Sequence, residues 1–245
     1  MLGIIDWGIG GIGIYRLIRE RLGFPVTYFS DTGVTPYGKM SRVELTGRLT
    51  RVMAFLRDRG VTHLAVGCNA ASTAIPYLDR SGIQVVGMIE PAVNMTARLR
   101  PTRLALLGGR RTVTSGAYRR AFSAKGIEVQ QRIAQPLSAL IETGDIGSES
   151  LRNEARRILM PIRESSHILL ACTHYPAIEP VLKTLVSPET RFIDPASEIV
   201  KIISRWTVDK AGDDIFLTSG DPKAMADAAK MAFGVSIKHP LCVRF

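Results

Sequence analysis

The sequence predicts an α/β protein made of two similar lobes, each with a mostly parallel sheet flanked by helices. Short apolar segments alternate with amphipathic stretches that carry Arg, Lys and Glu at helical spacing. Within these segments, apolar residues follow one another without alternating with polar ones, as expected for parallel strands that are covered on both faces. The order of these elements also repeats once along the chain. Together these three observations define the fold class.

Strands are expected where short β-rich apolar runs occur. In order along the chain, these runs cover 2–6, 25–30, 63–67, 83–89, 103–108, 166–171 and 190–195. Helices are expected between several of the strands, over 40–59, 113–125 and 149–164. Strands and helices in this order place the helices on the faces of the sheets.

The two halves of the chain share one pattern. "LGIIDWGIGGIGIYR" (2–16) and "RLALLGGRRTVTSGAYRR" (103–120) each place a strand before a glycine-containing turn and a helix. "HLAVGC" and "HILLAC" then each end in a cysteine, Cys68 or Cys172, and these lie 65 positions after Gly3 and 68 after Leu104. We therefore expect lobes related by a pseudo-two-fold axis. Because ligands of open α/β sheets bind at the carboxyl ends of the strands, both thiols should face one cleft.

The composition limits the class of protein. A chain of 245 residues with 46% hydrophobic content can bury a large core without cross-links. Its three cysteines are far apart in sequence and odd in number, which suits neither a disulfide framework nor a C-x-x-C site and indicates a reducing, cytoplasmic compartment. No segment reaches the roughly 18 to 20 apolar residues of a membrane span.

The net charge of +10 and the pI near 9.9 raise the question of a nucleic-acid partner. The basic residues are scattered as pairs such as Arg110-Arg111 and Arg119-Arg120, without interleaved aromatic residues that would stack on bases. A solvated basic surface is therefore the preferred interpretation. The glycines of "GIGGIG" (8–13) have G-x-G-G-x-G spacing, which does not indicate a nucleotide site on its own.

Two opposed thiols in one cleft indicate proton transfer at a carbon centre. One group removes a proton from one face of the carbon, and the other delivers a proton to the opposite face. A thiol has an ordinary pKa of about 8.5 and can act as either group when its site tunes it. The alternative is that Cys68 and Cys172 are small buried hydrophobes, as free cysteines usually are.

The setting of the two cysteines favours the functional interpretation. Each is followed by a hydrogen-bonding residue, Asn69 or Thr173, in a segment expected to lead to a helix N-terminus, where anions are stabilised. Cys242 in "HPLCVRF" has no such setting and is assigned to packing.

Six motifs carry a resemblance to a known family: "IIDWGIGG" (4–11), "DTGVTPYG" (31–38), "GCNAAS" (67–72), "PLSALIETG" (136–144), "ACTHYP" (171–176) and "LTSGDPKAM" (217–225). In their order and spacing, and over essentially its whole length, the chain resembles the glutamate racemase branch of the aspartate/glutamate racemase superfamily. The resemblance implies a cofactor-independent enzyme with its active site between two α/β lobes, which needs no PLP, metal or nucleotide.

The resemblance also implies roles for single residues. Cys68 and Cys172 match the two thiols that act as base and acid on opposite faces of Cα. Asp6 matches the acidic residue that serves the first thiol, His174 matches the histidine that serves the second, and Glu142 matches a further carboxylate near the site. Substrate contacts are implied at the positions of Trp7, Tyr37, Gly38, Asn69, Ala70 and Thr173. Without the resemblance, Asp6 would be interpreted as a turn cap, His174 as a core histidine and Glu142 as a solvated helix-end carboxylate.

Three positions depart from the family pattern. Trp7 stands where the family usually has serine, Ala70 where it has threonine, and Val34 where it often has arginine. The two lost hydroxyl groups belong to the family's substrate contacts. They leave open a racemase, epimerase or isomerase for a different amino or carboxylic acid, or a relative that binds an amino acid without turnover. A one-thiol decarboxylase is disfavoured because both cysteines are present.

The repeat and the resemblance together place the first lobe at 1–94 plus 195–245 and the second at 95–194. The chain is expected to cross between them near Pro91 and Pro195. The implied partner is a small-molecule amino acid, with neither nucleic acid nor membrane, and a homodimer is compatible with the resemblance. The implied role is the supply of D-glutamate for peptidoglycan in the cytoplasm.

Overall fold

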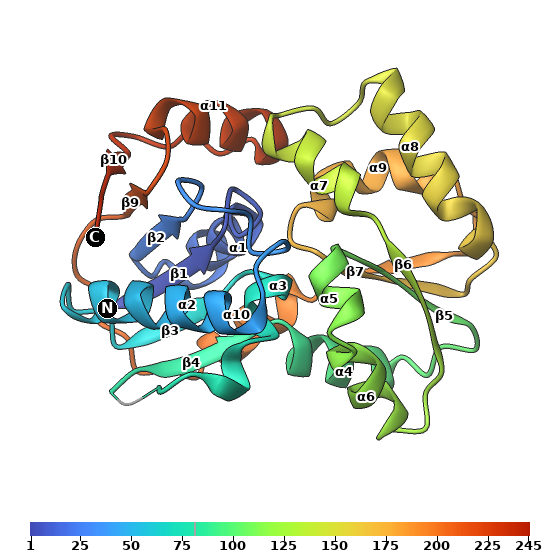
Figure 1. Cartoon of the computed structure of the whole chain (residues 1–245), viewed down its shortest axis with the longest axis horizontal. Helices are drawn as coiled ribbons and strands as arrows, with labels where there is room; N and C mark the ends of the chain where they lie inside the picture. The colour runs from blue at the N-terminus through green and yellow to red at the C-terminus, as the bar shows by residue number, and fades with distance from the viewer. Residues whose placement is uncertain (81) are drawn as a thin grey trace.

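The structure, a computed structural model of the chain, describes residues 1–80 and 82–245. It contains two sheets that lie side by side with helices on their faces (Figure 1). Every pair of neighbouring strands in both sheets is parallel. The predicted α/β class is therefore confirmed.

The larger sheet has the strand order β10-β9-β2-β1-β3-β4. Its strands are β1 (Leu2–Asp6), β2 (Val26–Ser30), β3 (His63–Val66), β4 (Gln84–Gly87), β9 (Ile215–Thr218) and β10 (Leu241–Cys242). The smaller sheet has the order β6-β5-β7-β8. Its strands are β5 (Leu104–Gly108), β6 (Val129–Ile133), β7 (His167–Ala171) and β8 (Arg191–Ile193).

Helices fill the connections between the strands. Those that precede β5 are α1 (Ile12–Leu22), α2 (Arg42–Arg57), α3 (Asn69–Ser72), the 3-10 turn η1 (Ile75–Tyr77) and α4 (Ile89–Arg98). The following ones are α5 (Arg110–Thr114), α6 (Ala117–Ser123), α7 (Gln135–Glu142), α8 (Glu149–Leu159), η2 (Met160–Ile162), η3 (Tyr175–Ile178) and α9 (Glu179–Lys183). The chain then returns to the larger sheet through α10 (Ala196–Ile203) and α11 (Pro222–Phe233).

The internal repeat is visible in the topology. The order β2-β1-β3-β4 in the larger sheet corresponds strand for strand to the order β6-β5-β7-β8 in the smaller one. The larger sheet takes its strands from 2–87 and 215–242, and the smaller sheet takes its strands from 104–193. This distribution supports the predicted lobes, whose residue limits stay a prediction.

All seven predicted strands are confirmed, with ends shifted by no more than two residues. Three further strands were not predicted from the pattern of apolar runs. The strand β6 reads "VQQRI" and lies at the edge of its sheet, so it carries polar side chains and lacks the apolar run used to find the others. The strands β9 and β10 are only four and two residues long and give little pattern.

Two predicted helices were wrong in their extent. The segment 113–125 does not form one helix, because Gly116 adopts a left-handed conformation with φ of 69° between α5 and α6. The helix predicted over 149–164 ends at Leu159 and continues as a 3-10 turn. Pro161 has no N–H to extend the α-helical hydrogen bonds.

The two lobes share a common region of core. One buried apolar cluster contains residues of both sheets, including Ile4 of β1 and Leu107 of β5, which are fully buried. The helix α11 also reaches from the larger sheet to α7 of the other lobe (Figure 1). Among the described residues, no helix combines the length and the apolar character needed to cross a membrane.

A buried ion pair supports the loop that follows β2. Arg48 donates two hydrogen bonds to the Asp31 carboxylate, at 2.8 and 2.6 Å, and both side chains are almost fully buried. The same carboxylate accepts hydrogen bonds from Tyr37 Oη at 2.6 Å and from Ser219 Oγ at 2.7 Å. The backbone N–H of Asp31 donates to the carbonyl of Asp6, so this network is joined to the end of β1.

We expect Asp31→Asn to lower the free energy of unfolding by about 3 to 5 kcal/mol, because the Arg48 guanidinium would lose its counter-charge in a buried position. Chemical denaturation followed by circular dichroism would measure this. The matched control is Asp227→Asn, which breaks an exposed pair with Lys223 and should change stability little. A loss for Asp31→Asn as small as that of the control would contradict the assignment.

Candidate active site

The carboxyl end of β1 places an acidic side chain between the lobes. Asp6 is 1% exposed and follows four apolar residues of the strand. Its Oδ1 accepts a hydrogen bond from the backbone N–H of Trp7 at 2.6 Å, and its Oδ2 accepts one from Thr173 Oγ1 at 2.9 Å. Thr173 follows β7, so the second hydrogen bond joins the two sheets.

Cys68 lies beside this carboxyl group. It follows β3, forms the N-cap of α3 and is buried. Its thiol interacts with the Asp6 carboxyl group through a hydrogen bond. Burial raises the pKa of the Cys68 thiol well above its ordinary value, and the charge of Asp6 raises it further. Burial also raises the pKa of Asp6. Cys68 is therefore protonated in the resting site.

Cys172 has a different partner. Its Sγ lies 3.6 Å from Nδ1 of His174, and Nε2 of the same ring lies 2.6 Å from Oε2 of Glu142. Burial, the largest single influence, lowers the pKa of His174. The hydrogen bonds with Cys172 and Glu142, together with their negative charges, outweigh it and raise the pKa well above its ordinary value. The positive charge of the His174 imidazolium therefore lies beside the Cys172 sulfur.

The two sulfur atoms of the site therefore have different partners. A neutral thiol lies beside a buried carboxyl group on one side, and a sulfur paired with an imidazolium lies on the other. These are the groups needed for a general acid and a general base that act together on one bound molecule. The predicted set of Cys68, Cys172, Asp6, His174 and Glu142 is brought together by the fold.

Two glycines of the β1–α1 loop allow the lobes to approach closely. A Cβ atom at Gly8 would overlap the Glu142 carboxylate, and one at Gly10 would overlap Thr173 Oγ1 and crowd Asp6 and His174. The backbone N–H of Ile9, between these glycines, donates to Glu142 Oε2 at 3.0 Å. This N–H therefore holds a residue of the predicted site from the opposite lobe.

The predicted substrate contacts differ in which polar groups they leave available to a ligand. Asn69 is 2% exposed, and its Nδ2 has no hydrogen-bond partner among the described residues of the chain. The Thr173 hydroxyl is already bonded to Asp6. The Tyr37 side chain is buried and its hydroxyl donates to Asp31, so this residue and Gly38 are left with backbone groups for a ligand.

Trp7 is held in place by its indole ring. Its Nε1 donates to the backbone carbonyl of Val34 at 3.1 Å. Trp7, Val34 and Ala70 all pack against the same apolar cluster of the first lobe. The three departures from the family pattern therefore belong to one region of the structure, and the indole contributes apolar surface there.

Some site residues have no sequence signal of their own. Tyr28 is fully buried in β2, and its hydroxyl donates to the carbonyl of Gly8 at 2.7 Å. Arg111 of α5 reaches the other lobe and donates to the Met40 carbonyl at 2.7 Å and to Thr73 Oγ1 at 3.0 Å. Neither lies in a recognisable motif, because each acts through a long-range contact.

The expected helix N-termini are weaker than the sequence indicated. The helix α3 after Cys68 has only four residues, and Cys172 is followed by the 3-10 turn η3. Helix dipoles of this length contribute little. The charges and hydrogen bonds of Asp6, His174 and Glu142 therefore dominate the electrostatics.

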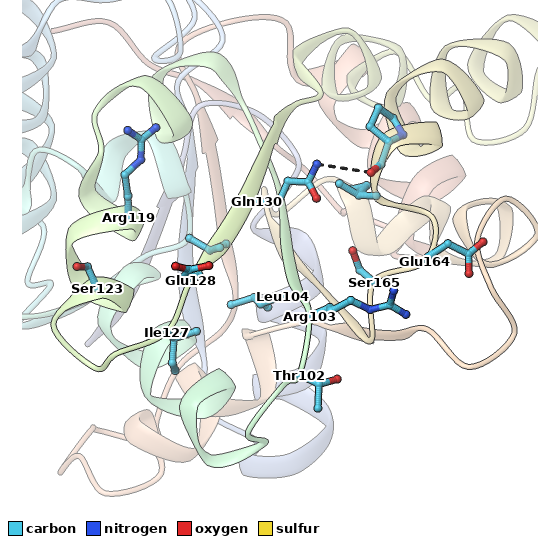
Figure 2. A pocket seen from close by; sticks show the side chains of 13 residues that line it. Thr102, Arg103, Leu104, Arg119, Ser123, Ile127, Glu128, Gln130, Glu164 and Ser165 are labelled. Atoms are coloured by element: carbon cyan, nitrogen blue, oxygen red, sulfur yellow. Dashed lines mark hydrogen bonds between the residues drawn. The ribbon is translucent and has the colours of Figure 1, made fainter.

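A separate cavity of about 670 Å³ lies at the amino ends of β5, β6 and β7 (Figure 2). Cys172 follows the opposite, carboxyl end of β7. Exposed charged side chains of both signs line it, including Arg103, Arg119 and Glu128. Gln130 Nε2 donates to the carbonyl of Pro161 at 3.5 Å beside it. None of the predicted site residues is among its described lining, so it does not belong to the thiol site.

The fold and the site define a two-lobed α/β enzyme in which a cysteine–carboxyl pair and a cysteine–histidine pair meet between two parallel sheets. The family model described as Asp/Glu/Hydantoin racemase matches residues 14–203. The chain belongs to this family.

Relatives named glutamate racemase match most of the chain. The protein from Desulforudis audaxviator is 34% identical over 208 residues, which are 82% of this chain and 76% of the relative. The protein from Gloeobacter violaceus is 34% identical over 242 residues, which are 94% and 91% of the two chains. The crystal structure of glutamate racemase from Francisella tularensis in complex with D-glutamate has the same fold, with a TM-score of 0.88 at 22% identity over 99% of this chain and 97% of that one.

We expect Gly8→Ala to lower kcat for amino-acid racemisation about 10- to 100-fold, because the added methyl group would displace the Glu142 carboxylate from His174. Steady-state kinetics would measure the effect. Gly47→Ala is the matched control, since Gly47 lies inside α2 with no atom within 4 Å of an added Cβ. The control should retain activity and gain about 0.5 to 1 kcal/mol of stability. Unchanged kcat in a folded Gly8→Ala variant would contradict the close-approach argument.

The raised pKa of Asp6 predicts a pH-dependent gain in stability for Asp6→Asn. The folded state binds the Asp6 proton more tightly than the unfolded state, so this contribution to stability is fully present below the ordinary value of 3.8 and is lost as the pH rises through the raised value. Asn remains neutral throughout. The free energy of unfolding of the variant minus that of the wild type should therefore be larger at about pH 7.5 than at about pH 4.5. Urea denaturation at both pH values would test this, and an equal difference at the two would contradict it.

Proposed function

We propose that the protein is a cofactor-independent glutamate racemase, which interconverts L- and D-glutamate by exchanging the proton on Cα. The observation that carries the proposal is that each cysteine has its own acid–base partner: Asp6 for Cys68, and His174 with Glu142 for Cys172. The two relatives named glutamate racemase, each 34% identical over most of this chain, support the choice of substrate.

The proposed proton transfers begin with a proton on Cys68, whose pKa is raised by burial. The Cys172 thiolate removes the Cα proton from one face and becomes a thiol. The Cys68 thiol delivers its proton to the opposite face and becomes a thiolate, so the charge balances. Asp6, whose pKa burial raises, is placed to return a proton to Cys68. Reversing the two transfers gives the reaction of the other enantiomer.

The carbanionic transition state needs donors that are already in position. The Asn69 amide has a buried N–H group without a partner among the described residues, which suits the substrate α-carboxylate. His174 carries positive charge beside the reacting sulfur and is itself held by Glu142. Because both sulfurs must come within about 3 to 3.5 Å of Cα or its proton, the contact between the lobes sets the reaction geometry.

Trp7 limits which groups can bind the distal carboxylate of the substrate. Since the indole N–H is bonded to the Val34 carbonyl, the ring presents apolar surface where the family usually has a serine hydroxyl. The distal carboxylate of glutamate must then be bound by backbone groups, for which Tyr37 and Gly38 are the candidates. A panel of single-enantiomer amino acids in D₂O would test this choice of substrate.

The proposal also includes a physiological setting that rests on the family resemblance. The enzyme would act in the cytoplasm and supply D-glutamate for peptidoglycan. A homodimer is the assembly to test first, by light scattering.

We expect Cys68→Ala and Cys172→Ala each to reduce racemisation by about 10²- to 10⁴-fold or more, because each removes one of two obligatory proton-transfer groups. Deuterium incorporation at Cα, followed by NMR in D₂O, and chiral chromatography of the product would measure it. The matched control is Cys242→Ala, which should keep full activity. The structure exposes this cysteine, so its assignment to packing from the sequence was wrong. Full two-way activity in either active-site variant would exclude the two-thiol mechanism. A wild type that exchanges another amino acid but not glutamate would exclude glutamate as the substrate.

A further inference from the structure

Tyr118 is not one of the predicted site residues, yet it contacts Asn69, which is one of them. It lies on α6 of the second lobe and is fully buried. Its hydroxyl donates to Oδ1 of Asn69 at 2.7 Å. Asn69 belongs to the first lobe and directly follows Cys68, so this hydrogen bond crosses between the lobes next to a catalytic thiol.

The hydrogen bond determines which end of the Asn69 amide is free. With Oδ1 accepting from Tyr118, the amide offers a ligand its Nδ2 donor, which is buried and has no partner among the residues that the structure describes. The reversed amide would set Nδ2 against the phenol and leave both the Tyr118 O–H and Oδ1 without this bond. The observed orientation satisfies both groups and keeps a donor available for an acceptor.

The surroundings of Tyr118 keep its hydroxyl in the donating form. Burial raises the pKa of the phenol, and the nearby Cys172 sulfur raises it further. The phenol is therefore neutral near pH 7 and can donate its proton to Asn69 Oδ1.

We propose that Tyr118 is a positioning residue that orients the Asn69 amide so that its N–H donor binds the α-carboxylate of the substrate. The inference rests on the proposed function, since it assigns a substrate group to the Asn69 donor. It also explains why a first-lobe ligand contact is oriented from the second lobe: the donor is set only when the two lobes are in contact.

The test is Tyr118→Phe, which removes one hydroxyl group and leaves the buried ring. We expect KM for glutamate to rise about 5- to 50-fold while kcat changes less than about 3-fold, because the freed amide can rotate away from the substrate before chemistry begins. The matched control is Tyr15→Phe, which removes a hydroxyl that also donates at 2.7 Å, to Asp214 near the start of β9. The control should leave both constants within about 2-fold of the wild type.

A double-mutant cycle separates positioning from a general loss of stability. Asn69→Ala should raise KM by itself, and Tyr118→Phe added to it should raise KM no further, because no amide is left to orient. Unchanged KM in Tyr118→Phe, or independent multiplication of the two effects, would overturn the inference while leaving the racemase activity established. A wild-type enzyme without Cα exchange on glutamate would overturn the proposed function, and this inference with it.

Discussion

The close approach of the β1–α1 loop to the second lobe is the constraint on which the whole site depends. Without side chains at Gly8 and Gly10, the loop brings Asp6 against Thr173 and lets the Ile9 N–H reach Glu142. Each of these hydrogen bonds joins a residue of the first lobe to a residue of the second. The acid–base groups of both cysteines are thus held by the opposite half of the molecule.

The site combines several buried ionisable groups, and each is costly to charge away from water. The structure offsets this cost by pairing. Asp6 has two hydrogen-bond donors besides the thiol, and Glu142 shares its carboxylate between the Ile9 N–H and His174. The Asp31–Arg48 pair has the same role farther from the thiols, where it anchors the loop that carries Tyr37. Stability and reactivity are therefore served by two neighbouring networks that are joined at the backbone of Asp6.

Much of this arrangement was accessible from the sequence. The fully apolar runs predicted seven strands, and the repeated strand–cysteine pattern predicted two similar lobes. Each of these patterns can be recognised in a short stretch of sequence. The pairing of Asp6 with Cys68 and of His174 with Cys172 came from motif resemblance. The edge strand β6 was missed because its side chains are polar, and Gly116 divided a predicted helix because a left-handed residue is not evident from helical spacing. Tyr28, Tyr118 and Arg111 were missed because their roles depend on partners far away in the chain.

The different partners of the two sulfurs have a consequence for the order of events in the proposed reaction. Burial raises the pKa of Cys68 and keeps a proton on this sulfur, so the resting site is prepared to protonate the face of the ligand beside Cys68. In the proposed two-thiol reaction, each turnover passes that proton to the product and leaves a proton on Cys172. The same conversion would then be repeated only after these protons had been redistributed. The hydrogen bond from the Thr173 hydroxyl to Asp6 joins the acid group of one thiol to the loop that carries the other, so both sides of the proposed exchange are connected within the fold.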